Sequence, residues 1–473
     1  MSASLAQEQK GIHFLNRISF GPTREELQKV DDIGISAYLE QQLHPENIPD
    51  SLVEEKLAGL KTMRLSSREL TELYPTPQQA KQQAAQEMGR QQIMQGPRVI
   101  ILELQQARLL RAVYSQRQLY EIMVDFWSNH FNIFAGKGAN RWLTTSYDRD
   151  TIRPHALGGF RDLLLATAQS PAMLFYLDNW LSVAPNVVAL RLAPNSPRRG
   201  LNENYAREVM ELHTLGVDGG YTQRDVEEVA RCFTGWTIRQ PRGEAQFIFN
   251  PRIHDDGEKT VLGARIPAGG GINDGLKVID LLARHPSTAR FVSTKLARRF
   301  ISDDPPASII NVAAEAFRQS DGNIRTVLRT IIDSPEFFSP EAYLAKVKKP
   351  LEYTASALRI TGADVRVSRQ LLRYLGRMGE PLFLAQPPTG YPDVAASWVS
   401  PDMLLTRINF VTDLVRNRLP GARVQPEVLR DAESFKPLVA AGRLSPATYA
   451  ALSETGGFES VALLLSSQEF QRR

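Results

Sequence analysis

The chain has 473 residues, of which 42% are hydrophobic and 23% charged, and this ordinary balance excludes a wholly disordered protein. Lys and Arg number 56 against 52 for Asp and Glu. This slight excess is spread along the whole sequence, which argues against nucleic-acid binding. No stretch approaches the roughly 20 apolar residues that a membrane span needs, and the single cysteine excludes an internal disulfide.

Helix start and stop signals recur along the chain. Thr23 with Glu26 and Thr222 with Asp225 have the spacing of capping boxes, and Gly216 is placed to end a helix. The clearest strand signals are 246–249 and 259–263, which a turn-like segment separates. We therefore predict a mostly α protein, one large helical domain with one small β-hairpin insertion.

The composition predicts four regions in chain order. They are an N-terminal helical lobe (1–75), a Gln-rich helix or flap (76–97), a central helical domain that carries the candidate site (98–340), and a C-terminal helical region packed on the central domain (341–473). The first ten residues lack a basic segment followed by an apolar one, so no signal peptide is predicted and the chain as written is expected in the cytoplasm.

Two polar stripes run along helices that are otherwise apolar. At about 100° per residue, the helix predicted over 118–132 places Glu121, Asp125, Asn129 and Asn132 on one face. The segment 202–213 does the same for four more side chains: Asn204, Arg207, Glu208 and Glu211. A carboxylate removed from water needs an ion-pair partner or a metal, unless it is kept for acid–base work. If the stripes face each other, they predict a buried cluster of carboxylates.

A third group of polar residues lies between the stripes. Asp148, Asp150, Arg153 and His155 fall within eight positions, where they can position an anionic or hydroxyl-rich ligand. The alternative is structural, with Asp150 capping a helix and the arginines at 149, 153 and 207 neutralising the acids.

Aromatic and histidine side chains add to this region. Tryptophans 127, 142, 180 and 236 lie near the acids, as in sugar sites, although buried tryptophan is also common in cores. His254 precedes an aspartate in a predicted turn, where it can act as a general acid or stabilise the turn. His130 and His213 face apolar sides and are expected in the core.

These residues suggest a hydrolase acting on a glycan or related polyhydroxylated substrate. Glu208 and Glu211 are the acid–base candidates, with Asp125 or Asp148 as the second carboxylate. The candidates for substrate binding are Asn204, Arg207, Arg153, His155, Trp127, Trp236 and His254. Two alternatives stay open: a divalent-metal protein that uses Asp125, Glu208, Glu211 and one histidine, or a binding protein without catalytic activity. No cofactor is identified.

Several motifs together resemble one known family. They are 20–23 (FGPT), 126–131 (FWSNHF), 152–158 (IRPHALG), 202–208 (NENYARE), 212–217 (LHTLGV), 233–236 (FTGW) and 390–393 (GYPD). The sequence resembles the bacterial DUF 1800 family of unknown function nearly from end to end. The resemblance implies no settled activity. Members are often exported and encoded beside sulfatase-like proteins, which implies such a protein as a candidate partner.

Overall fold

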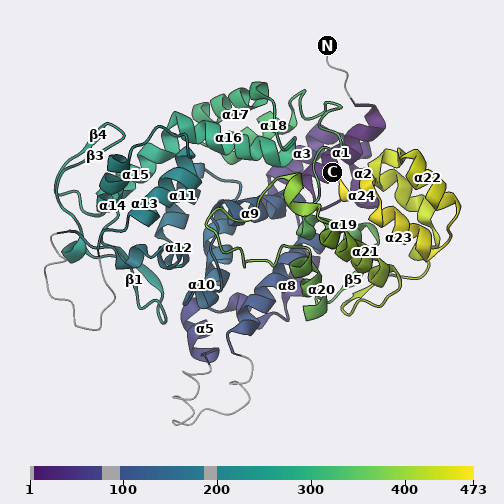
Figure 1. Ribbon diagram of the computed structural model, residues 1–473, viewed down its shortest axis with the longest axis horizontal. Helices are drawn as coiled ribbons and strands as arrows, with labels where there is room; N and C mark the ends of the chain where they lie inside the picture. The colour runs from purple at the N-terminus through teal and green to yellow at the C-terminus, as the bar shows by residue number, and fades with distance from the viewer. Residues whose placement is uncertain (1–4, 77–95, 186–199) are drawn as a thin grey trace, which may run out of the picture.

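The computed structural model describes residues 5–76, 96–185 and 200–473, and this part of the chain is mostly helical, as predicted (Figure 1). The Gln-rich segment predicted over 76–97 falls almost entirely outside the described residues. The β structure of the described ranges consists of three antiparallel sheets of two strands each.

The helices follow one another in short connections. The N-terminal ones are α1 (Gln7–Ile18), α2 (Arg24–Ile33), α3 (Ile35–Leu43), α4 (Ser51–Leu57) and α5 (Ser67–Leu73). The next are α8 (Arg98–Tyr114), α9 (Gln118–His130), α10 (Asn140–Ser146), α11 (Phe160–Gln169), α12 (Pro171–Tyr176), α13 (Glu203–Met210) and α14 (Gln223–Cys232). The remainder are α15 (Ile272–Arg284), α16 (Pro286–Phe300), α17 (Ala307–Gln319), α18 (Ile324–Ile332), α19 (Pro350–Ile360), α20 (Arg369–Arg377), α21 (Pro401–Val415), α22 (Pro446–Ser453), α23 (Phe458–Ser466) and α24 (Gln468–Gln471).

The prediction of a single hairpin is wrong, because the two expected strands belong to different hairpins. Strand β2 (Gln246–Phe249) pairs with β1 (Trp236–Arg239), and β3 (Lys259–Val261) pairs with β4 (Ala264–Ile266). The β3–β4 turn has Leu262 and Gly263 both at positive φ, 49° and 79°, which is the backbone of a tight two-residue hairpin loop. A third pair, β5 (Asp364–Val365) with β6 (Ala422–Arg423), was not expected.

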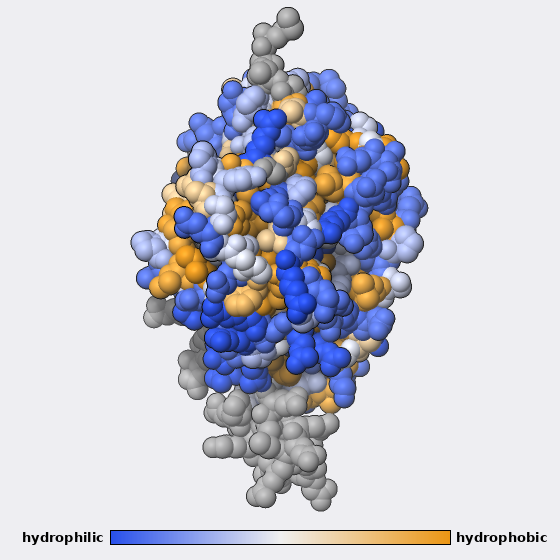
Figure 2. Space-filling view, turned by 90° about the vertical axis from the view of Figure 1, so that its right-hand side faces the viewer, coloured by the Kyte–Doolittle hydropathy of each residue, from blue (hydrophilic) through white to orange (hydrophobic). Residues whose placement is uncertain are grey.

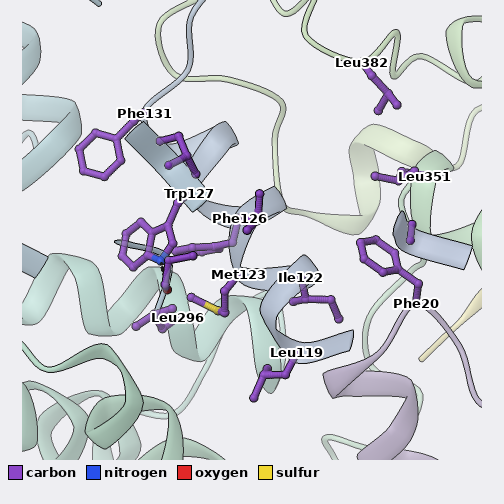
Figure 3. Close-up of a cluster of buried hydrophobic side chains, with 14 of the residues drawn as sticks. Phe20, Leu119, Ile122, Met123, Phe126, Trp127, Phe131, Leu296, Leu351 and Leu382 are labelled. Atoms are coloured by element: carbon purple, nitrogen blue, oxygen red, sulfur yellow. Dashed lines mark hydrogen bonds between the residues drawn. The ribbon is translucent and has the colours of Figure 1, made fainter. Parts of the chain in front are cut away.

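Helix α9 lies at the centre of the molecule (Figure 1). Its apolar side chains form the middle of the core, together with Phe20, Leu296, Leu351 and Leu382 from distant parts of the chain (Figure 3). Trp127 of α9 is fully buried and donates its indole N–H to the Ala156 carbonyl, 3.0 Å away. The opposite face of α9 is left for polar residues.

Contacts also tie the ends of the sequence together. His13 of α1 bonds to the carbonyl of Phe337, and Glu26 of α2 forms a buried ion pair with Arg359 of α19. Both termini lie in the right half of Figure 1, close to α24. The division into lobes stays a prediction, but these bonds join the region predicted as the N-terminal lobe to residues near and beyond position 337.

The face formed by the C-terminal helices mixes polar and apolar surface (Figure 2). Leu405 and Ile408 of α21 are among the exposed large apolar side chains. Within the three described ranges, no helix combines the length and apolar character that crossing a membrane requires.

Candidate functional site

Charged side chains from five segments form a continuous series of ion pairs beside α9. Arg153 binds both carboxylate oxygens of Glu121, at 2.9 and 2.8 Å, and its Nε donates to Asp148 at 3.0 Å. This fork-like geometry is the strongest form of the arginine–carboxylate pair. Asp148 belongs to a π-helical turn, Tyr147–Ile152, that continues α10.

The series continues toward α19. Arg108 of α8 donates to Asp148 at 2.6 Å and to Asp125 at 3.3 Å. Lys349 Nζ, which directly precedes α19, lies 3.3 Å from Asp125 and 3.9 Å from Glu380. We call the seven alternating groups the ionic chain: Glu121, Arg153, Asp148, Arg108, Asp125, Lys349 and Glu380.

The two ends of the ionic chain differ in their protonation. Burial raises the pKa of Asp148, but Arg153 and Arg108 more than offset this and lower it to about 2. Glu380 behaves in the opposite way, because burial outweighs the attraction of Lys349 and raises its pKa to about 7, with Asp125 adding repulsion. The ionic chain holds four carboxyl groups and three cations, so the carboxyl at its end is the one that retains a proton near neutral pH.

The depressed pKa of Asp148 predicts a loss of stability in acid. Its pKa rises from about 2 in the folded state to 3.8 when unfolded, so its contribution is complete above pH 4 and disappears as the pH falls through about 2. The loss from this group amounts to about 2 kcal/mol. Urea unfolding between pH 5 and 2 measures it. Asp148→Asn should flatten the pH dependence, whereas the exposed control Asp256→Asn should leave it unchanged; an unchanged slope in Asp148→Asn contradicts the assignment.

A small cavity opens beside the ionic chain. Its volume is about 40 Å³, and its walls include Arg108, Asp125, Lys349 and Glu380, with Asn129 at one side. We call it the acidic cavity. A water molecule needs about 10–15 Å³ of such volume, so the acidic cavity has room for a few waters and not for a sugar ring.

A second pocket adjoins the acidic cavity. Its volume is about 140 Å³, and it shares Asn129, Lys349 and Tyr391 with the acidic cavity. Lys295 and Arg298 of α16 add positive charge to its wall. We call it the cationic pocket.

A larger hollow lies on the other side of the segment 382–384. It measures about 480 Å³ and is lined by Leu384 and residues of α8, whereas Leu382 and Phe383 line the acidic cavity. Phe383 has a positive φ of 62°, a strained conformation for an aromatic residue, and its ring lies 5.0 Å from the Arg108 guanidinium. Phe383 therefore separates the acidic cavity from this outer hollow.

The amides of the α9 stripe hold a loop, 385–391. Asn129 accepts a hydrogen bond from the backbone N–H of Tyr391 at 2.7 Å and donates one to its carbonyl at 2.8 Å. Asn132 donates to the carbonyls of Ala385 and Pro387. The polar face predicted for α9 is present, but its amides bind backbone groups.

Gly390 is required where this loop meets α9. Its φ is +70°, and a Cβ placed there would come within 2.5 Å of Asn129 Oδ1. Gly390→Ala is expected to lower the unfolding free energy by more than the about 1 kcal/mol that positive φ alone costs. Gly362→Ala is the matched control, because Gly362 also has positive φ but open space around it. Equal losses in thermal or urea unfolding would refute the crowding at Gly390.

Glu208 and Glu211 occupy a different place from the ionic chain. Glu208 is half-buried and has no hydrogen bond or ion pair among the described residues; burial and the neighbouring Glu211 raise its pKa. Glu211 accepts a hydrogen bond from Tyr221 at 2.6 Å. Tyr176, whose pKa Glu208 raises, donates to the carbonyl of Gln386. The loop 385–391 thus contacts α9 on one side and Tyr176 on the other, and no hydrogen bond or ion pair of the described residues joins the two acidic stripes.

Comparison with known proteins identifies the chain. The family described as protein of unknown function (DUF1800) matches residues 13–472, almost the whole length. The chain belongs to the DUF1800 family. The resemblance inferred from the motifs is confirmed, while no curated protein and no solved structure matches.

Three of the residues proposed for substrate binding in this DUF1800 protein lie in its interior. Trp127 and Trp236 are fully buried, so neither ring offers a free face to a sugar, and the predicted stacking wall is corrected to core packing. His254 is not at an open turn; it is buried, bonds to Thr234, and lies 3.3 Å from Asp274.

The other predicted residues are more peripheral. Asn204 is exposed, Arg207 donates to Gln223, and His155 bonds to the carbonyl of Thr151. Arg153 is buried in the ionic chain. No three His, Cys, Asp or Glu residues come together as metal ligands in the described part of the DUF1800 chain, so the predicted set Asp125, Glu208, Glu211 and one histidine does not converge there.

Sequence reasoning missed Lys349 and Glu380. Lys349 belongs to a run with lysines at 346 and 348, directly before a helix that the structure buries on every side. Glu380 stands between Gly379 and Pro381 after the end of α20 and accepts a hydrogen bond from the backbone N–H of Leu351. Lysines next to a fully apolar helix, and an acid fixed between glycine and proline, were the available signals in this DUF1800 sequence.

Proposed function

We propose that this DUF1800 protein is a hydrolase that cleaves a glycan or related polyhydroxylated substrate, with Glu380 as general acid and Asp125 as general base. One observation supports this most: two carboxyl groups from distant segments line one cavity, both within 4 Å of Lys349 Nζ, at 3.3 and 3.9 Å. The proposal keeps Asp125 from the sequence hypothesis and moves the acid from Glu208 to Glu380.

The environments of the two carboxyl groups suit opposite roles. Glu380, with its pKa raised to about 7, carries a proton that it can donate to the leaving oxygen. Asp125 lies between the cations Arg108 and Lys349, which favour its ionised form, and it accepts the proton of the attacking water. In this step the water oxygen bonds to the substrate carbon as the bond to the leaving oxygen breaks.

Asp148 has a positioning role in the proposal. Arg153 and Arg108 occupy both of its oxygens, and the side chain is almost fully buried, so it has no free oxygen for a substrate. It orients Arg108, which in turn holds Asp125. The acidic cavity itself accommodates the attacking water, and the outer hollow of about 480 Å³ is the larger space for substrate. Displacement of Phe383 would connect the two.

The first experiment is a substrate screen with purified full-length protein. Incubation with a panel of glycans and small glycosides, followed by measurement of released reducing ends, should identify at least one substrate. Turnover should be lost in Glu380→Gln and in Asp125→Asn. Activity that survives in both variants overturns the assignment of the acidic cavity.

The pair Glu208 and Glu211 is a second candidate for the acid and base. It is favoured by the unpartnered, half-buried carboxyl of Glu208 and by the upward shift of its pKa. Glu208→Gln should abolish turnover if this pair is the catalytic one and should leave most of it if Glu380 is the acid. The same substrate therefore separates the two candidates.

Binding without catalysis is the remaining alternative, with a sulfatase-like protein as partner. The closed pairs of Arg153 with Glu121 and Asp148 are consistent with a structural role for these acids. Co-purification of the two proteins, with a protein of similar charge as control, tests the partnership.

A further inference from the structure

The cationic pocket contains more positive charge than its own acids neutralise. Lys295, Arg298 and Arg299 of α16 and Lys349 line it, with Asp393 as its one carboxylate among the described residues. Asp393 is already engaged, because it lies 3.2 Å from Lys346. Lys349 is engaged by Asp125 and Glu380, and Arg299 by Glu352 at 2.7 Å.

The remaining donors have no acidic partner within the described ranges. Lys295 makes no hydrogen bond or ion pair there, and its ammonium lies only against the ring of Phe291, at 5.4 Å. Arg298 uses its Nε for the Asp303 carbonyl and leaves the rest of its guanidinium free. Arg299, almost fully buried, has an Nη1 with no acceptor. Buried donors of this kind are costly unless something accepts from them.

We propose that the cationic pocket binds a tetrahedral oxyanion, sulfate or phosphate, held by Lys295, Arg298 and Arg299. Such a group offers several acceptor oxygens that charged donors bind strongly. A volume of about 140 Å³ accommodates it. Neighbouring polar groups of Asn129 and Thr389 also line the pocket.

The position of the pocket gives the anion a role. Asn129, Lys349 and Tyr391 separate it from the acidic cavity and line both. An ester whose sulfate or phosphate occupies the cationic pocket would therefore place its alcohol portion toward Asp125 and Glu380. That the anion belongs to the substrate rests on the proposed function, whereas anion binding by the pocket does not.

Calorimetric titration of the full-length protein with sodium sulfate and with sodium phosphate tests the proposal, with sodium chloride at matched ionic strength as the reference. Sulfate or phosphate should bind with saturation where chloride does not, and the tighter of the two identifies the ester class. Lys295→Met and Arg298→Ala should each weaken binding about tenfold or more. Lys277→Met, an exposed lysine on α15, is the matched control and should bind as the wild type does.

Each outcome has a defined meaning. Equal affinity in wild type and both pocket variants, or no binding beyond chloride, overturns the proposal. If Lys295→Met does not fold, as circular dichroism would reveal, Arg298→Ala decides, since Arg298 is less buried. Glu380→Gln should keep its anion affinity, so loss of turnover with intact binding reports on the hydrolase proposal alone.

The pH dependence gives an independent check. Burial lowers the pKa of Lys295 to about 8. The other groups facing the pocket do not titrate there: burial lowers the pKa of His130 and, to about 3, that of His213, while burial raises that of Tyr391. Lys349 and Asp393 stay charged because the pKa of the first is raised and that of the second lowered, and the guanidiniums of Arg298 and Arg299 keep their charge. Sulfate affinity should fall as pH rises through about 8, and a flat profile contradicts the role of Lys295.

Discussion

Replacing Glu380 by glutamine is expected to reduce turnover of the substrate by about 10²- to 10⁴-fold, the range that one general acid contributes. The fold should persist, because the glutamine carbonyl can still accept the hydrogen bond of the Leu351 N–H. The wild type should lose activity as pH rises through about 7, where Glu380 ionises. Initial rates across pH 5–9, in wild type and variant, measure both effects.

Stability provides a check on Glu380 that needs no substrate. Its pKa is raised from 4.5 to about 7, so the unfolded protein releases this proton at lower pH than the folded one. The wild type should therefore lose stability between pH 4.5 and 7, and Glu380→Gln should not show this component. An infrared carbonyl band that disappears near pH 7 in wild type and is absent from the variant would identify the group. A wild-type band that disappears near pH 4.5 would contradict the assignment.

Replacing Arg153 by methionine is expected to lower the unfolding free energy by about 3–5 kcal/mol, the usual cost of removing one partner from a buried ion pair. Methionine is similar in reach but leaves Glu121 and Asp148 without the three hydrogen bonds that Arg153 donates. Burial would then raise the pKa of both carboxyls. Urea unfolding at pH 7 measures the loss, which should shrink at pH 4 as the orphaned carboxyls take up protons.

The matched control is a surface pair of the same chemistry. Arg284 and Asp321 lie 2.9 Å apart, with side chains 62% and 64% exposed. Arg284→Met should change stability by no more than about 1 kcal/mol. If Arg153→Met costs no more than Arg284→Met, the ionic chain does not have the structural weight assigned to it.

The sequence predicted what helical periodicity determines. Glu121, Asp125, Asn129 and Asn132 do share one face of α9, since residues three and four apart lie on the same side of a helix. The capping boxes at Thr23 and Thr222 are also present. Both are local properties, set within a few residues of the chain.

The partners of that face could not be predicted, because they come from far away and from segments without periodicity. Lys349 and Glu380 lie more than 200 positions beyond Asp125, and no spacing rule connects them. The expected meeting of the two acidic stripes failed to allow for the loop 385–391, which lies between α9 and Tyr176. Beyond Met210 the helix also changes to a π-helical turn, Glu211–Leu215, so regular periodicity no longer applies there.

The double grip on the loop 385–391 has a consequence for dissecting the protein. Its backbone is secured by side chains that precede it by more than 200 positions, and the cavity wall closes only when Glu380 and Tyr391 have arrived. A fragment comprising residues 98–340 would contain Asp125 and Arg108 yet leave them facing solvent. The chemistry of this molecule therefore belongs to the assembled chain, and proteolytic pieces should carry none of it.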